Sequence, residues 1–131
     1  MARRMPRRYV SAMTPDDFRR IALSMSEAME VYRWGHSEFR VERRAFASLG
    51  GPADTVATLN LTSEQQAVFM DAAPRVFEPV AGDWGRLGST NVLLAAAEEV
   101  MVQSAIEAAW RNVAPKPPLK RKKRADKPPR S

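Results

Sequence analysis

The chain has 131 residues, of which 44% are hydrophobic, with a formal net charge of +6 and no cysteine. This length and composition predict one soluble domain with a hydrophobic core, and they exclude disulfide bonds and thiolate chemistry. No apolar run is long enough to cross a bilayer, and no apolar stretch follows the N-terminal arginines as in a signal peptide. We therefore expect a cytoplasmic protein without membrane contact.

The charge is unevenly distributed along the chain. Residues 1–12 contain four arginines and no acidic residue, which gives +4. Residues 115–131 contain eight lysines and arginines, one aspartate and five of the ten prolines, which gives +7. The segment 13–114 has nine arginines, no lysine and fourteen carboxylates, which gives −5. We expect a mildly acidic domain over 13–114, flanked by a disordered basic arm (1–12) and a disordered basic tail (115–131).

The first predicted element is a helix over about 15–26. Thr14 suits the N-cap and Pro15 the first helical position, and Asp16 and Asp17 favour the positive end of the helix dipole. A stripe of apolar residues at i, i+3, i+4 and i+7 predicts its buried face: Phe18, Ile21, Ala22 and Met25.

A meander of short strands follows, because apolar and polar residues alternate between turn signals. The predicted strands are 28–34, 38–41, 45–49 and 55–61. The segments between them are Gly35-His36, the polar hairpin Glu42-Arg43-Arg44, and the break Gly50-Gly51-Pro52. These links are too short for parallel crossovers, so we expect antiparallel pairing.

A second helix is predicted over 64–72, with Thr62 or Ser63 as its cap and Ala67, Val68 and Phe69 as its apolar side. At most a further short turn is expected over 74–77. A loop with three glycines is then predicted around Trp84. A last strand over 89–94 and a last helix over 97–113 follow it. The expected buried stripe of this last helix is Val102, Ile106, Ala109, Trp110 and Val113. The order α-β-β-β-β-α-β-α predicts an α+β fold in which a sheet of about five strands carries its helices mostly on one face.

The residues needed for catalysis or metal binding do not assemble in the sequence. His36 is the only histidine, so a His/Cys metal site or a Ser-His-Asp triad lacks its members. Gly82, Gly85 and Gly88 have the wrong spacing for a nucleotide-binding loop. We interpret them as sites of close backbone approach with Trp84 as a plug, and we predict no catalytic residue, metal or cofactor.

Five pieces of sequence occur in order over about 13–116: Met13–Arg19, Trp34–Val41 with Ala45–Leu49, Leu61–Gln66, Trp84–Gly88, and Ala109–Lys116. In these pieces the chain resembles the YjbR (MmcQ/YjbR-like) family of small bacterial proteins. The resemblance implies an α+β fold similar to that of CyaY/frataxin, a DNA-binding role, and a chain start at Met13. The sequence departs from the family's usual Gly-Trp-Thr at Gly88-Ser89-Thr90.

The leading hypothesis is a non-catalytic, monomeric nucleic-acid-binding protein, DNA being the expected ligand. The basic tails would provide affinity through phosphate contacts, and an arginine-bearing hairpin would provide orientation. The candidate residues are Arg40, Arg43, Arg44, Arg86, Lys120, Arg121, Lys122, Lys123 and Arg124.

Two alternatives stay open. The first is a protein-interaction adaptor, with an aromatic sheet face made of Tyr32, Trp34, Phe39 and Trp84. His36 would join this pocket or partner surface. The second follows the frataxin-like fold to iron binding, which would require Asp16, Asp17 and Glu27 to gather on one ridge.

Overall fold

A computed structural model describes residues 13–33, 35–50 and 56–115. The elements in chain order are α2 (Pro15–Ser24), β1 (Ala28–Arg33), β2 (His36–Val41), β3 (Arg44–Gly50), β4 (Val56–Asn60), α3 (Ser63–Ala72), β5 (Phe77–Pro79), α4 (Asp83–Arg86), β6 (Ser89–Leu93), the short 3₁₀ helix η1 (Leu94–Ala96) and α5 (Glu99–Val113). The predicted arm, the tail beyond Pro115 and Trp34 lie outside the described residues.

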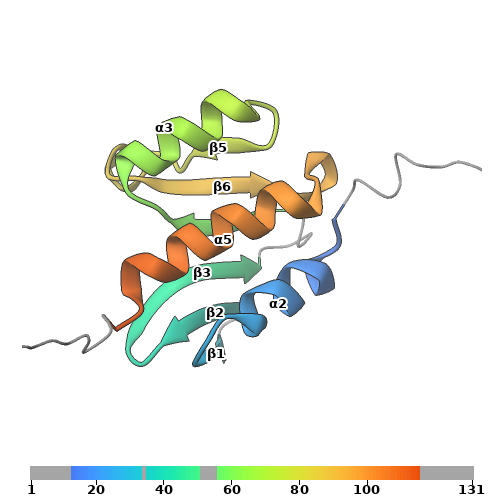
Figure 1. Ribbon diagram of the computed structural model, residues 1–131, viewed down its shortest axis with the longest axis vertical. Helices are drawn as coiled ribbons and strands as arrows, with labels where there is room; N and C mark the ends of the chain where they lie inside the picture. The colour runs from blue at the N-terminus through green and yellow to red at the C-terminus, as the bar shows by residue number, and fades with distance from the viewer. Residues whose placement is uncertain (1–12, 34, 51–55, 116–131) are drawn as a thin grey trace, which may run out of the picture.

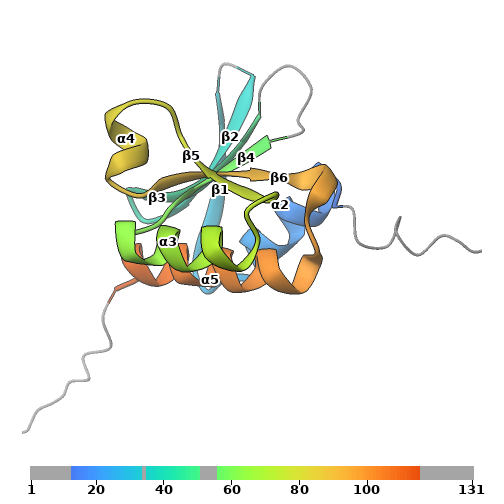
Figure 2. The same ribbon diagram turned by 90° about the horizontal axis from the view of Figure 1, so that it is seen from above.

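The strands form one antiparallel sheet in the order β1-β2-β3-β4-β6-β5. Helices α2, α3 and α5 cover one face, whereas the single turn α4 lies on the other side of the sheet (Figures 1 and 2). The predicted α+β class, the antiparallel meander and the one-sided helical layer are confirmed. Within the described part of the chain, no helix has the length and apolar character needed to span a bilayer.

Besides the short 3₁₀ helix η1, two elements are additional to the prediction. β5 pairs with β6 where we expected at most a turn, so the sheet has six strands. Its first residue, Phe77, is buried and packs against Phe69 of α3, with ring centroids 5.3 Å apart. α4 occupies part of the expected glycine loop. Both elements are too short for a periodic pattern to identify.

Two residues predicted in turns belong to the strands that follow. His36 and Arg44 begin strands, since His36 pairs with Arg33 and Arg44 pairs with Val41. The turn between β2 and β3 therefore has two residues, Glu42 and Arg43, and Glu42 has a φ of 57°. Positive φ is typical of two-residue hairpin turns because it matches the twist of the flanking strands.

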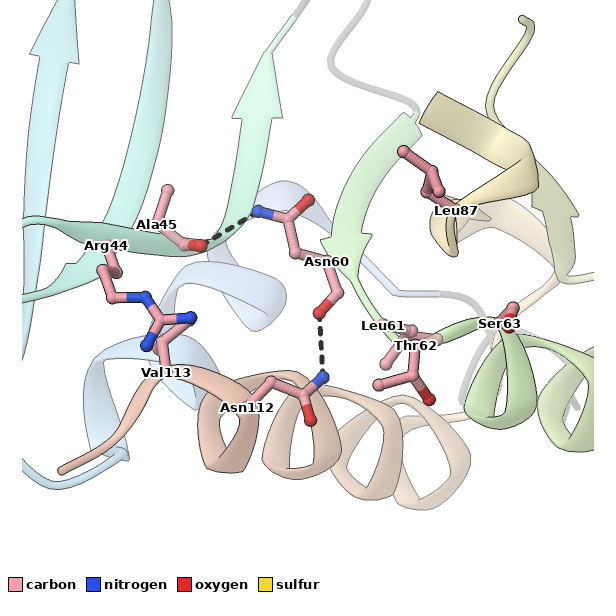
Figure 3. A pocket seen from close by; sticks show the side chains of 9 residues that line it. All are labelled: Arg44, Ala45, Asn60, Leu61, Thr62, Ser63, Leu87, Asn112 and Val113. Atoms are coloured by element: carbon pink, nitrogen blue, oxygen red, sulfur yellow. Dashed lines mark hydrogen bonds between the residues drawn. The ribbon is translucent and has the colours of Figure 1, made fainter. Parts of the chain in front are cut away.

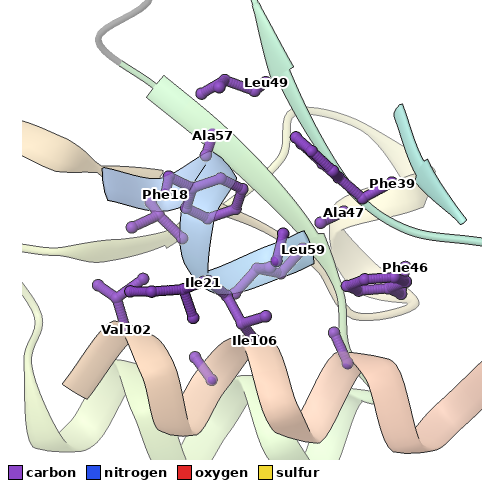
Figure 4. Packing of buried hydrophobic residues seen from close by; sticks show 14 of the residues in the cluster. Phe18, Ile21, Phe39, Phe46, Ala47, Leu49, Ala57, Leu59, Val102 and Ile106 are labelled. Atoms are coloured by element: carbon purple, nitrogen blue, oxygen red, sulfur yellow. The ribbon is translucent and has the colours of Figure 1, made fainter. Parts of the chain in front are cut away.

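The core lies between the sheet and the helical layer (Figure 4). Thr14 and Thr62 cap α2 and α3 through reciprocal side-chain and backbone hydrogen bonds, as expected of either residue. Of the stripe predicted for α5, all but Trp110 are buried: Val102, Ile106, Ala109 and Val113. Trp110 is half-buried, and its indole N–H donates to the Ser26 carbonyl at 2.9 Å.

A β-bulge in β3 gives the core an extra aromatic side chain. Phe39 pairs with Ala47, whereas the next residue, Arg40, pairs with Ala45. Phe46 is therefore the unmatched residue, and both Phe46 and Ala47 are buried although they are sequence neighbours. Strict alternation along a strand would have exposed one of the two.

The prediction of the apolar side of α3 was wrong. Val68 is 64% exposed, Ala67 is exposed and Phe69 is half-buried, whereas the buried residue of this helix is Gln66. The reason is that Gln66 finds hydrogen-bond acceptors in a segment far along the chain.

Candidate functional site

The structure divides the nine arginines of the described residues by their partners. Five of them are in ion pairs with carboxylates: Arg19, Arg20, Arg40, Arg86 and Arg111. Arg33 also has an interaction. Arg43, Arg44 and Arg75 make no side-chain hydrogen bond or ion pair with any other described residue, and all three are exposed. These three exposed guanidinium groups therefore have no competing carboxylate among the described residues.

The four predicted arginines of the domain do not form one strip. Arg40 lies on the sheet face away from the helices, and its guanidinium donates to Glu38 at 2.5 and 3.0 Å. Arg86 is paired with Asp83 within α4. Only Arg43 and Arg44 remain together, at the β2–β3 hairpin. The predicted residues Lys120 to Arg124 lie outside the described residues.

An open pocket of about 740 Å³ adjoins this hairpin (Figure 3). It lies where the start of β3, the end of β4, the start of α3 and the end of α5 meet. The residue after α4 completes its wall. The lining residues are Arg44, Ala45, Asn60, Leu61, Thr62, Ser63, Leu87, Asn112 and Val113. Sequence reasoning missed this pocket because its walls come from four separate segments of the chain.

Side-chain amides join the pocket walls. Asn60 donates to the carbonyl of Ala45 at 2.9 Å, and Asn112 donates to the carbonyl of Asn60 at 3.1 Å (Figure 3). Asn112 also exchanges hydrogen bonds with Gln65, whose side-chain oxygen accepts from the backbone N–H of Thr62. This chain of hydrogen bonds links β3, β4, α5 and α3, so Arg44 stands beside a pocket with a fixed shape.

The basic tail leaves the domain at the same pocket. Asn112 and Val113 line it at the C-terminal end of α5, which lies beside the β2–β3 hairpin (Figure 1). Only the five residues Lys116–Lys120 follow Pro115 up to the start of the run Lys120 to Arg124. The basic run therefore follows the pocket-lining end of α5 closely in the sequence.

The segment Gly82–Gly88 is anchored by close backbone contacts. A Cβ atom on Gly85 would lie 1.7 Å from the Val80 carbonyl oxygen, and one on Gly88 would lie 2.1 Å from that of Leu61. The predicted close approach is therefore confirmed for Gly85 and Gly88, but a Cβ on Gly82 would meet no atom within 4 Å. Trp84 is not a plug, because it is 69% exposed. The contact of Gly88 with Leu61 also places Leu87 beside the start of α3.

Gln66 is the hydrogen-bonding link between α3 and this segment. Its side-chain nitrogen lies 2.9 Å from the Gly85 carbonyl oxygen, and 3.1 Å from both the Ser89 carbonyl oxygen and the Thr90 hydroxyl. The hydroxyl of the fully buried Thr90 donates in turn to the Gly88 carbonyl at 2.7 Å. These bonds satisfy carbonyls that α4 and the start of β6 would otherwise leave buried without partners.

Substituting Gln66 by leucine is expected to lower the free energy of unfolding by about 2 kcal/mol, because buried carbonyls lose their donor. Urea denaturation of the full chain measures the loss. The control is Ala67→Ser, at an exposed position in the same helix. Gln65→Leu is not suitable as a control, because Gln65 belongs to the cap of α3. A loss below about 0.5 kcal/mol for Gln66→Leu would show that this network does not hold the segment.

The residues of the adaptor hypothesis do not form one aromatic face. Phe39 is fully buried and packs edge-on against Phe18 at 6.1 Å, so it belongs to the core. Tyr32 is 70% exposed on the edge strand β1, whereas Trp84 lies on α4, which contacts β6 near the opposite edge of the sheet. His36 is half-buried at the start of β2. Trp34 lies outside the described residues.

Two of the three carboxylates of the iron hypothesis, Asp16 and Asp17, are bound to other groups, and Glu27 is exposed in the turn before β1. Asp16 pairs with Arg19, and Asp17 caps α2 and pairs with Arg20. The Thr14 backbone N–H, which donates to Asp17, holds the pKa of that carboxyl below its ordinary value. Among the residues that the structure describes, no three His, Cys, Asp or Glu side chains gather as metal ligands would.

The fold is similar to that of a protein whose structure has been solved. The crystal structure of Deinococcus radiodurans protein DR2400, of domain family DUF419, superposes with a TM-score of 0.60 at 14% identity. The match covers 76% of this chain and 77% of that chain. DUF419 is the YjbR family of the sequence resemblance. No known family model matches this sequence, and no curated protein is detectably similar to it.

Proposed function

We propose that this protein is a non-catalytic nucleic-acid-binding protein of the YjbR family that contacts the phosphate backbone of DNA. The observation that carries the proposal is the position of Arg43 and Arg44. They are two unpaired, exposed guanidinium groups at one hairpin, beside the point where the basic tail leaves α5. The similarity in fold to DR2400, together with the five sequence pieces, supports the family assignment.

The charge distribution favours contact with phosphates over contact with base edges. A phosphate backbone needs only positive charge within reach, and the tail with the adjoining hairpin offers this. The remainder of the domain is acidic, and five of its arginines are already paired with carboxylates. We therefore propose binding that depends strongly on salt and weakly on DNA sequence.

The test is a fluorescence-anisotropy titration of the full chain with a labelled duplex of about 20 base pairs at several salt concentrations. The double variant Arg43→Gln/Arg44→Gln is expected to bind about tenfold more weakly. Its plot of log K against log salt should be less steep by about 2, because each lost phosphate contact removes about 0.9.

Arg75→Gln is the matched control. Arg75 is also exposed and unpaired among the described residues, but it follows the end of α3 that is opposite the pocket. Its removal should leave affinity and slope unchanged. Neutralising the run Lys120 to Arg124 with glutamines, in the full chain, should cause the larger loss. Absence of binding by the wild-type protein at low salt would overturn the proposal. If the double variant and Arg75→Gln lose the same affinity per arginine, the hairpin has no special part in binding.

A further inference from the structure

α4 presents two large apolar side chains to solvent. Trp84 is 69% exposed and Leu87 is 68% exposed, among the highest values for large hydrophobic side chains in the described residues. They lie three residues apart in one helical turn, closed by the bond from the Leu87 N–H to the Trp84 carbonyl at 3.2 Å. Residues at this spacing lie on the same side of a helical turn. Together they form an apolar platform, which we call the α4 platform.

The platform is held rigidly in this exposed position. Gly85 packs on the Val80 backbone, Gly88 packs on the Leu61 backbone, and Gln66 donates to the Gly85 carbonyl. A flexible loop would be free to fold these side chains against the sheet, whereas this one is fixed. Trp110 shows the contrasting case, because it is half-buried and its indole N–H is bound by Ser26. No hydrogen bond joins the Trp84 indole to another described residue.

The platform borders the pocket that Arg44 also lines. Leu87 contributes to the wall of the pocket, and Arg44 stands at the β3 side of it (Figure 3). Leu87 therefore connects the exposed aromatic ring of Trp84, in the same helical turn, with a pocket that also carries an unpaired guanidinium. This combination complements a nucleotide, whose base is a flat apolar ring and whose phosphate is an anion.

We propose that the preferred ligand is single-stranded nucleic acid, with a base stacked on Trp84 and the neighbouring backbone phosphates directed to Arg44. This inference rests on the proposed function and names its substrate class. In a duplex each base is stacked between its neighbours and offers no free face to a protein ring. Duplex binding would then use the charges alone, whereas a single strand would gain stacking in addition.

The experiment compares a labelled single strand of mixed sequence with the duplex made from it, using the full chain at one salt concentration. The wild type should bind the single strand more tightly. Trp84→Ala is expected to weaken single-strand binding about tenfold and duplex binding less than twofold, with an unchanged salt slope. Trp84→Phe should retain most of the affinity for the single strand, because it keeps an aromatic face.

Tyr32→Ala is the matched control, since Tyr32 is as exposed as Trp84 but lies at the opposite edge of the sheet. It should change neither affinity, and circular dichroism should show that all variants are folded. The inference fails if Trp84→Ala changes neither the affinity for the single strand nor that for the duplex, or lowers both equally. The proposed function would still stand in that case if the Arg43→Gln/Arg44→Gln variant loses binding. If the wild type binds neither DNA, both fail.

Discussion

Substituting Gly85 by alanine is expected to lower the free energy of unfolding by about 3 kcal/mol, the upper range for overpacking a closed site. Intrinsic helix propensity predicts the opposite sign, because alanine is favoured over glycine within a helix by about 1 kcal/mol. The steric effect should dominate, since the new Cβ would lie 1.7 Å from the Val80 carbonyl oxygen and 2.8 Å from its carbon.

Val80 has little freedom to move away from such a side chain. Its backbone N–H donates to the Ser89 carbonyl at 2.9 Å, which continues the pairing of β5 with β6. Relief of the clash would therefore require α4 to move and the bond from Gln66 to the Gly85 carbonyl to break. Denaturation by urea, followed by circular dichroism, measures the loss of stability.

The neighbouring substitution Trp84→Ala is the control for this prediction. It changes the same turn, but it removes an exposed side chain, so the free energy of unfolding should stay within about 0.5 kcal/mol of the wild type. A Gly85→Ala variant as stable as the wild-type protein would show that the contact with Val80 is not tight. In that case the α4 platform would not be rigid.

The second large effect is expected at Phe46, the bulge residue of β3. Phe46→Ala should lower the free energy of unfolding by about 3 to 5 kcal/mol, because it removes a fully buried ring and leaves a cavity. The bulge holds the backbone so that Phe46 and Ala47 both face inward, and the neighbouring side chains have little freedom to fill the space.

Phe46→Leu separates volume from the aromatic ring and should cost about 1 to 2 kcal/mol, since most of the apolar surface stays buried. Tyr32→Ala, on the exposed edge strand, should be almost neutral. The same denaturation measurement serves for all three variants. A loss of less than about 1 kcal/mol for Phe46→Ala would contradict the packing shown in Figure 4.

Local patterns were sufficient for the long elements of the fold. Thr14 and Thr62 were recognisable as caps, and the stripes of α2 and α5 were recognisable by their spacing, because caps and periodicity depend on near neighbours. The two ion pairs Arg40–Glu38 and Arg86–Asp83 are also local. Both pairs could have been predicted from the sequence, once Glu38 and Arg40 had been assigned to a strand and Asp83 and Arg86 to a helical turn.

The remaining features depend on contacts between segments far apart in the chain. β5 exists because Phe77 packs on Phe69 and pairs with β6, and Gln66 is buried because the Gly85 and Ser89 carbonyls face it. In the candidate site, the sequence identified Arg43 and Arg44 as hairpin residues but did not show that α5 ends beside them.

The amino-acid sequence by itself determined that the positive charge lies in the two ends of the chain and that the domain between them is acidic. Charge and composition are additive along a sequence, so no structure was needed for that conclusion. The tertiary structure decided which arginines stay unpaired, and that Arg44, Leu87 and the start of the basic tail share one pocket. Such a convergence arises from the packing of α3, α4 and α5 around the sheet, which no local pattern contains.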